Sequence, residues 1–110
     1  MSPADAIVVL VTAGSEAEAA RIGRALVDER LAACVNIVGR IRSIYRWEGA
    51  VEDAHEHLLI VKARAVDLAR LERRVRQLHS YEVPEVLALP VQDGSAPYLA
   101  WLDEATRRDD

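Results

Sequence analysis

The sequence predicts a single α+β domain in which two helices cover one face of an antiparallel β-sheet. The hydrophobic pattern changes its period along the chain in the order strand, helix, strand, strand, helix, strand. The second and third strands are unusually long and are joined by the short turn Glu48-Gly49. This order is that of a ferredoxin-like split βαβ sandwich. We therefore expect that fold over residues 1–110, with a long hairpin, a short C-terminal helix, and frayed ends at residues 1–5 and 107–110.

A buried run and a capping box mark the first strand and the first helix. Residues 7–11 form a continuous apolar run, which is typical of a strand covered on both faces. Ser15 stands three residues before Glu18, so each side chain can bond a backbone N–H at the start of a helix. A helix is predicted over residues 16–30, with an apolar stripe formed by Ala19, Ile22 and Leu26.

Residues 33–47 and 50–63 are predicted to form the long hairpin. Alternation in the first of these strands places its apolar and aromatic residues on one face, namely Val35, Ile37, Ile41, Tyr45 and Trp47. Its arginines then share the other face: Arg40, Arg42 and Arg46. A simple two-residue turn at Glu48-Gly49 would place Arg42 opposite His55 and Arg40 opposite His57.

The second half of the chain predicts two helices separated by a strand. Residues 66–79 carry an apolar helical stripe, Leu68, Leu71, Val75 and Leu78, and an opposite face of arginines, Arg70, Arg73, Arg74 and Arg76. Pro84 prevents continuation of this helix, and residues 86–89 are expected to form the fourth strand. Pro97 suits the first turn of a third helix, which carries Tyr98, Trp101, Leu102 and Ala105.

Composition and charge exclude several classes of function. The net charge is −4, with 14 basic and 18 acidic residues, which disfavours nucleic-acid binding. The apolar run near the start is too short for a signal peptide or a membrane span, so we expect a cytoplasmic protein that does not contact membranes. Cys34 is the only cysteine and cannot form an internal disulfide, in agreement with a reducing compartment.

The hairpin also predicts self-association. Its strands are too long for two helices to cover, and both faces of residues 58–61 are apolar. An exposed apolar face with long open edges would aggregate unless something covers it. Another copy of the chain is the favoured cover. The alternative is that the third helix folds over the open face.

No motif for a familiar catalytic or nucleotide site is present. The sequence lacks a glycine-rich phosphate loop, CxxC, HExxH and Gly-x-Ser-x-Gly, so we expect that the protein is not an enzyme. His55 and His57 lie two apart in a strand and share a face, where they could chelate a metal. Arginines opposite them disfavour a cation, so a solvated or interface histidine pair is the preferred interpretation.

Three segments together carry a resemblance to a known family. They are residues 29–49 (ERLAACVNIVGRIRSIYRWEG), residues 78–85 (LHSYEVPE) and residues 98–102 (YLAWL). In this order and spacing, the chain closely resembles the CutA divalent-cation tolerance proteins. The resemblance implies a ferredoxin-like homotrimer in which sheets join edge to edge through the hairpins. It also implies a role in tolerance of or response to divalent metal ions, copper among them.

Candidate metal ligands follow from the residues and from this resemblance. They are His79, Glu82, Glu85 and Cys34, of which His79 could instead cap the second helix and Cys34 could be a small buried residue. The copper ligands implied by the family include a cysteine and a second histidine at positions that here look like Val11 and Leu78, so only weak copper or zinc binding is expected. Two other departures are Gly39-Arg40 in place of Pro-Gly and Ser80 in place of proline.

A second group of residues is expected at a cleft or interface between subunits: Tyr45, Trp47, Glu48, Lys62, Tyr81 and Trp101. The alternative function is a trimeric signalling or assembly scaffold resembling the PII proteins, with a small effector bound in the clefts between subunits. The tight turn at Glu48-Gly49 argues against it, because such a protein uses a long flexible loop to reach its partners.

Overall fold

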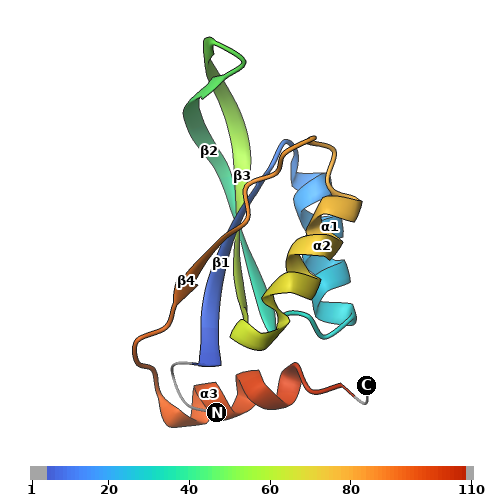
Figure 1. The fold of residues 1–110 in the computed structure, drawn as a ribbon, viewed down its shortest axis with the longest axis vertical. Coiled ribbons are helices and arrows are strands. Elements are labelled where there is room, and N and C mark those ends of the chain that lie inside the picture. The colour runs from blue at the N-terminus through green and yellow to red at the C-terminus, as the bar shows by residue number, and fades with distance from the viewer. Residues whose placement is uncertain (1–4, 109–110) are drawn as a thin grey trace.

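The computed structural model describes residues 5–108 and contains one four-stranded sheet, two helices packed on it, and a third helix at its end (Figure 1). The elements in chain order are β1 (Ala6–Ala13), α1 (Glu16–Asp28), β2 (Cys34–Trp47), β3 (Ala50–Arg64), the 3₁₀ turn η2 (Ala65–Asp67), α2 (Leu68–Leu78), β4 (Leu87–Pro90) and α3 (Ala96–Ala105). This is the predicted α+β, ferredoxin-like arrangement.

The strands are ordered β2-β3-β1-β4, and each neighbouring pair is antiparallel. Helices α1 and α2 lie side by side against one face of the sheet, as Figure 1 shows. The core between the two layers is built from fully buried aliphatic residues, including Val9, Val11, Ile22, Leu26, Leu59, Val61, Leu71 and Val75. The contact between layers is close, because a side chain at Gly23 of α1 would meet Val35 of β2 at 3.1 Å.

Helix boundaries follow local backbone chemistry. The hydroxyl of Ser15 accepts a hydrogen bond from the N–H of Glu18, as the capping box predicts. Helix α1 ends before the predicted Arg30 because Arg30 adopts a left-handed conformation with φ of 58°. Helix α2 begins two residues later than predicted, since residues 65–67 form a 3₁₀ turn first.

The register of the hairpin contains a β-bulge that the sequence pattern does not reveal. From the turn inward, Arg42 lies opposite His55 as predicted, but the register shifts between Val38 and Ile41. Two residues, Gly39 and Arg40, therefore face the single residue His57. A side chain at Gly39 would lie 2.8 Å from the His57 ring, which explains the glycine at this position.

The bulge overturns the predicted single apolar face of β2. Ile37 pairs with Leu59 whereas Ile41 pairs with Glu56, and these two β3 residues are an odd number of positions apart. Because opposed residues share a face and successive residues alternate, Ile37 and Ile41 lie on opposite faces. The prediction that Val35 and Ile37 share a face with Tyr45 and Trp47 is therefore wrong.

The outer part of the hairpin projects beyond the rest of the sheet. Strand β1 ends at Ala13, opposite His57, so the pairs from Ile41↔Glu56 to Trp47↔Ala50 are made by β2 and β3 alone. Glu48 and Gly49 both have positive φ, 49° and 82°, as a tight two-residue turn of this hand requires. The hairpin rises clear of the helices in Figure 1.

Helix α3 packs across the end of the sheet and leaves its second face open. Leu99 and Leu102 form a small separate core with Ala6 and Ala33 near the strand ends. Open-face residues of the edge strand β4 remain accessible, with Leu87 58% and Leu89 49% exposed. The alternative in which α3 covers the open face is thus not the observed arrangement.

The described end of the chain is anchored rather than frayed. Arg108 Nη2 lies 2.5 Å from Oδ1 of the buried Asp67, and Nη1 donates to the carbonyl oxygen of Arg30 at 2.8 Å. Arg107 pairs with Asp103 one helical turn back in α3. Residues 1–4 and 109–110, for which fraying was also predicted, lie outside the described residues.

Candidate functional site

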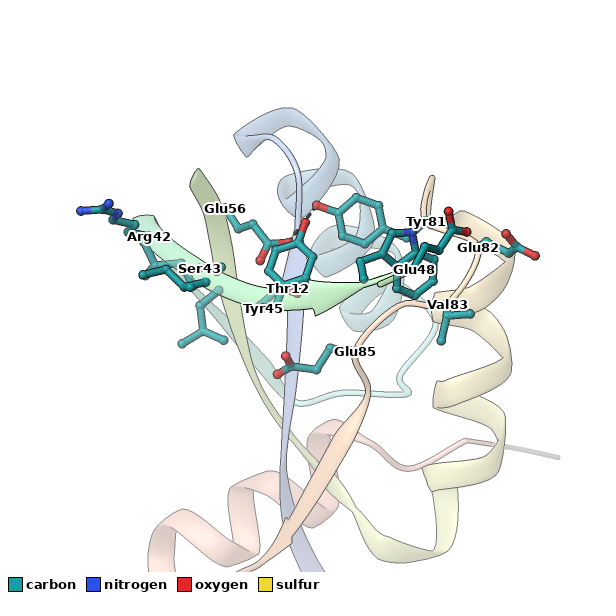
Figure 2. Close-up of a pocket in the computed structure, with 14 residues that line it drawn as sticks. Thr12, Arg42, Ser43, Tyr45, Glu48, Glu56, Tyr81, Glu82, Val83 and Glu85 are labelled. Atoms are coloured by element: carbon teal, nitrogen blue, oxygen red, sulfur yellow. Dashed lines mark hydrogen bonds between the residues drawn. The ribbon is translucent and has the colours of Figure 1, made fainter. Parts of the chain in front are cut away.

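A cleft of about 830 Å³ lies where the projecting hairpin meets the segment that follows α2. Figure 2 shows side chains from both segments converging on it, together with Thr12 at the end of β1. Three aromatic residues line the cleft, Tyr45, Trp47 and Tyr81, with four carboxylates, Glu48, Glu56, Glu82 and Glu85. Arg42 is the one cationic lining residue among the described residues.

His79 fixes the start of the segment that forms one wall of the cleft. Its ring is 9% exposed, and Nε2 lies 2.6 Å from the carbonyl oxygen of Thr12. Nδ1 accepts a hydrogen bond from the backbone N–H of Tyr81 at 3.0 Å. This pair of bonds requires a neutral imidazole with its proton on Nε2. A metal ion at either nitrogen would have to displace one of them.

Glu18 ties the same segment to the first loop. Its carboxylate accepts hydrogen bonds from the backbone N–H groups of Ser80 at 2.9 Å and Gly14 at 3.3 Å. Burial alone would raise the pKa of Glu18, but these hydrogen bonds outweigh it and hold the pKa below the ordinary value. The Glu18 side chain is therefore both a helix cap and a clamp on the residue after His79.

Tyr81 connects the cleft wall to the hairpin. Its hydroxyl donates to Oε2 of Glu56 at 2.8 Å, and Glu56 is only 6% exposed. Burial, and then this carboxylate, raise the pKa of Tyr81 well above its ordinary value, so the phenol stays protonated. The bond holds the Glu56 carboxylate in the wall of the cleft, where it accepts the hydrogen bond of Tyr81.

The two predicted carboxylate ligands lie in the cleft but in different environments. Glu82 is exposed, whereas Glu85 is half-buried. Burial, and then the nearby charge of Glu56, raise the pKa of Glu85. A cation beside Glu85 would relieve this unfavourable field, which makes the cleft favourable for positive charge.

Other predicted site residues lie elsewhere. Cys34 pairs with Lys62 across β2 and β3, and both contact the amide oxygen of Asn36. Trp101 lies on α3 and stacks at a tilt on Tyr98, with 5.4 Å between the rings. Cys34, Lys62 and Trp101 are thus grouped at the α3 end of the sheet, away from His79 and the cleft.

The hairpin histidines His55 and His57 are also not part of a group of potential metal ligands within residues 5–108. Arg42, opposite His55, forms a bidentate ion pair with Asp53, with N···O distances of 2.8 and 2.6 Å. Within residues 5–108, no three His, Cys, Asp or Glu side chains are grouped in a way that could hold a metal ion. The residues therefore do not form a ready-made metal centre.

Sequence reasoning missed several residues that line the cleft, among them one from each of three strands. Thr12, Arg42 and Glu56 come from β1, β2 and β3, and none carries a motif. Glu56 could have been found from the two-residue turn, because that turn already places Glu56 opposite Ile41, on the strand that carries Tyr45 and Trp47. Its bond to Tyr81 joins residues 25 apart in sequence and could be found only in the folded chain.

Fold and cleft together define a small ferredoxin-like protein with a projecting hairpin and an acidic, aromatic-lined cleft. Residues 7–105 match the model of the family described as CutA1 divalent ion tolerance protein. The chain belongs to this family.

Individual relatives agree over nearly the whole chain. The divalent-cation tolerance protein CutA of Thermus thermophilus is 52% identical, over 90% of this chain and 96% of its own length. The solved structure of the Cut A1 protein from that organism has a TM-score of 0.90, with 93% of this chain and 99% of that chain covered. The chloroplastic protein CutA of Arabidopsis thaliana is 48% identical over 92% of this chain, which spans 56% of that protein's length.

A relative from Archaeoglobus fulgidus, described as a periplasmic divalent cation tolerance protein, has a TM-score of 0.90 at 39% identity, with 93% of this chain and 99% of that chain covered. Relatives thus carry names that place them in different compartments. Among the described residues of this chain, no helix is both long and apolar enough to cross a bilayer.

The raised pKa of Glu85 predicts a pH-dependent cost to stability. The pKa of Glu85 in the folded protein lies above the ordinary value. The free energy of unfolding therefore falls as the pH rises from the ordinary pKa through the folded-state pKa. Glu85→Gln should therefore raise the melting temperature by a few degrees at about pH 8 and by less at about pH 5. Thermal unfolding of the variant and of the exposed-site control Glu82→Gln would measure this. An equal gain at both pH values would contradict it.

Proposed function

We propose that the protein is a non-catalytic, cytoplasmic divalent-cation tolerance protein that works as a homotrimer and binds copper or zinc weakly. The observation that carries the proposal is the projecting hairpin beside an open apolar sheet face. Family membership supports the metal-related role, because the family is named for tolerance of divalent ions. Absence of a nucleophile–base motif in the sequence supports a role without catalysis.

The apolar surface supports assembly with further copies of the chain. Ile44 and Val51 on the hairpin are 65% and 63% exposed, and Leu87 on edge strand β4 is 58% exposed. Both edge strands, β2 and β4, present unpaired backbone groups. Edge-to-edge joining of copies would pair these groups. It would also bury the apolar residues, and each Å² of apolar surface removed from water contributes about 25 cal/mol of stabilisation. A closed ring leaves no edge for further growth.

The cleft is better suited to weak cation binding than to a preformed metal centre. Glu82 and Glu85 offer oxygen ligands on one segment, in a field made negative by Glu56. His79 would add a ligand only by giving up a bond to Thr12 or Tyr81. Cys34 lies at the other end of the sheet and takes no part in this site.

Calorimetric titration of copper(II) and zinc(II) tests the cation site. We expect weak to moderate binding in the native protein and its loss in Glu82→Gln/Glu85→Gln. The matched control Glu16→Gln/Glu52→Gln removes two exposed carboxylates that do not line the cleft and should leave binding intact. Loss of binding in His79→Ala, with binding retained in the cleft variant, would move the site to His79. No binding in the native protein would overturn the metal proposal.

A second candidate is the trimeric scaffold that holds a small effector. The cleft volume of about 830 Å³ favours it, since small-molecule sites span about 300–1,000 Å³. The tight Glu48-Gly49 turn opposes it, because no long loop extends from the hairpin to a partner. Retention of a metabolite in place of metal, seen by native mass spectrometry of freshly purified protein, would favour the scaffold.

A further inference from the structure

Arginines gather at the opposite side of the molecule, on the outer surface of the helices. A hollow of about 290 Å³ is lined by Arg70, Arg73, Arg74 and Gln77 of α2, with Glu29, Leu31 and Arg108. We call this hollow the arginine groove. Its lining residues come from the end of α1, from most of the length of α2, and from the chain after α3. A second hollow shares Arg108 and adds Arg30 and Arg107.

This grouping works against the stability of α2. Arg70 and Arg74 are one helical turn apart and Arg70 and Arg73 are three apart, so like charges are neighbours on one face. Like charges at these spacings destabilise a helix. Arg70 also lies in the first turn, where the helix dipole disfavours positive charge. The chain as a whole is acidic, with a net charge of −4.

Part of the groove is held in place by ion pairs. Arg74 Nε lies 3.0 Å from Oε1 of Glu29, which fixes its guanidinium against the end of α1. Arg108 is held by Asp67, a residue only 3% exposed. Arg73 is exposed, and it makes no ion pair with any residue in the range 5–108 that would offset its repulsion from its neighbours.

We propose that the arginine groove binds a compact multivalent oxyanion of the diphosphate class. Guanidinium groups match phosphate oxygens through paired N–H donors, and all but one of the 14 basic residues are arginine. No described residue that lines either hollow is aromatic, so nothing there would stack on a nucleotide base. The groove would therefore recognise the charge and the phosphate geometry of the anion, without contacts to a base.

The site is independent of the proposed assembly and cation site. None of its residues belongs to a strand, and none lines the acidic cleft. An anion here would offset the repulsion among Arg70, Arg73 and Arg74 and would interact favourably with the N-terminal end of α2. Binding should consequently raise the melting temperature of the protein.

Calorimetric titration of the full chain with inorganic pyrophosphate at low ionic strength tests the proposal. We expect saturable binding that weakens as salt is added. Arg73→Gln should reduce affinity about tenfold, as expected for the loss of a charged hydrogen bond. The matched control Arg76→Gln removes the same charge from the same helix, but Arg76 pairs with Glu72 and does not line the groove. Its affinity should stay close to that of the native protein.

Three results would overturn the proposal. They are no pyrophosphate binding at low salt, equal weakening by Arg73→Gln and Arg76→Gln, and affinity unchanged in Arg73→Gln. Equal weakening would mean that the helix attracts anions only through its overall charge. Arg73 is exposed and contributes nothing to the core, so both variants should fold, and unchanged circular dichroism confirms this.

Discussion

Replacing Asp67 by alanine should lower the free energy of unfolding by about 3–5 kcal/mol, the usual cost of removing one partner of a buried ion pair. The Asp67 side chain is 4% exposed and lies 3.1 Å from Nη2 of Arg64 and 2.5 Å from Nη2 of Arg108. Without it, two largely buried guanidiniums lose their common partner, and the chain end that Arg108 anchors loosens. Urea unfolding at fixed protein concentration would measure the change.

Asp28→Ala provides the matched control for Asp67. Asp28 pairs with Arg24 at 3.3 Å, but both side chains are well exposed, at 62% and 82%. Exposed ion pairs contribute only about 0.2–1 kcal/mol, so this variant should unfold close to the native protein. Equal losses in the two variants would show that the Asp67 network is no more important than a surface pair.

Trp47→Ala should shift the proposed trimer to smaller species, with a loss of at least about 2 kcal/mol of association free energy per interface. Trp47 precedes the hairpin turn and is 42% exposed in the isolated chain. A large ring left half in water on a projecting hairpin is suited to burial against another copy. Sedimentation at micromolar concentration would measure the shift, and the melting temperature of the variant should lie below that of the native protein at the same concentration.

Val66→Ala separates this effect from a general loss of apolar surface. Val66 is 79% exposed, but it lies in the 3₁₀ turn before α2 rather than on the hairpin. The control should keep the native copy number. A Trp47→Ala variant with native mass and native melting temperature would instead assign Trp47 to ligand binding in the cleft.

Hydrophobic period and turn chemistry were enough to predict the order and type of the elements. The Ser15 cap and the turn at Glu48-Gly49 were confirmed, because both depend on residues close in sequence. The other half of the capping box differs, since the Glu18 carboxylate accepts from the N–H groups of Gly14 and Ser80. The bulge at Gly39 and Arg40 was not predicted, since it arises from contact with His57 on the neighbouring strand. This one extra residue moves each β2 residue between the bulge and the turn to the opposite face of the sheet.

The candidate site was predicted in part. Tyr45, Trp47, Tyr81 and the acidic residues of the hairpin and loop do meet in one cleft. Cys34 and Lys62 do not, because β2 and β3 are so long that residues on the same strand lie at opposite ends of the molecule. Trp101 does not either, because it lies on α3. The hydrogen bonds of His79 to Thr12 and Tyr81 depend on how the loop closes over β1, which no sequence spacing encodes.

In the proposed trimer, other copies of the chain complete the projecting hairpin and the open sheet face. Native mass spectrometry of the purified protein at micromolar concentration tests it most directly. We expect a dominant species of three times the 12.2 kDa chain mass. A dominant 12.2 kDa monomer under the same conditions would contradict it.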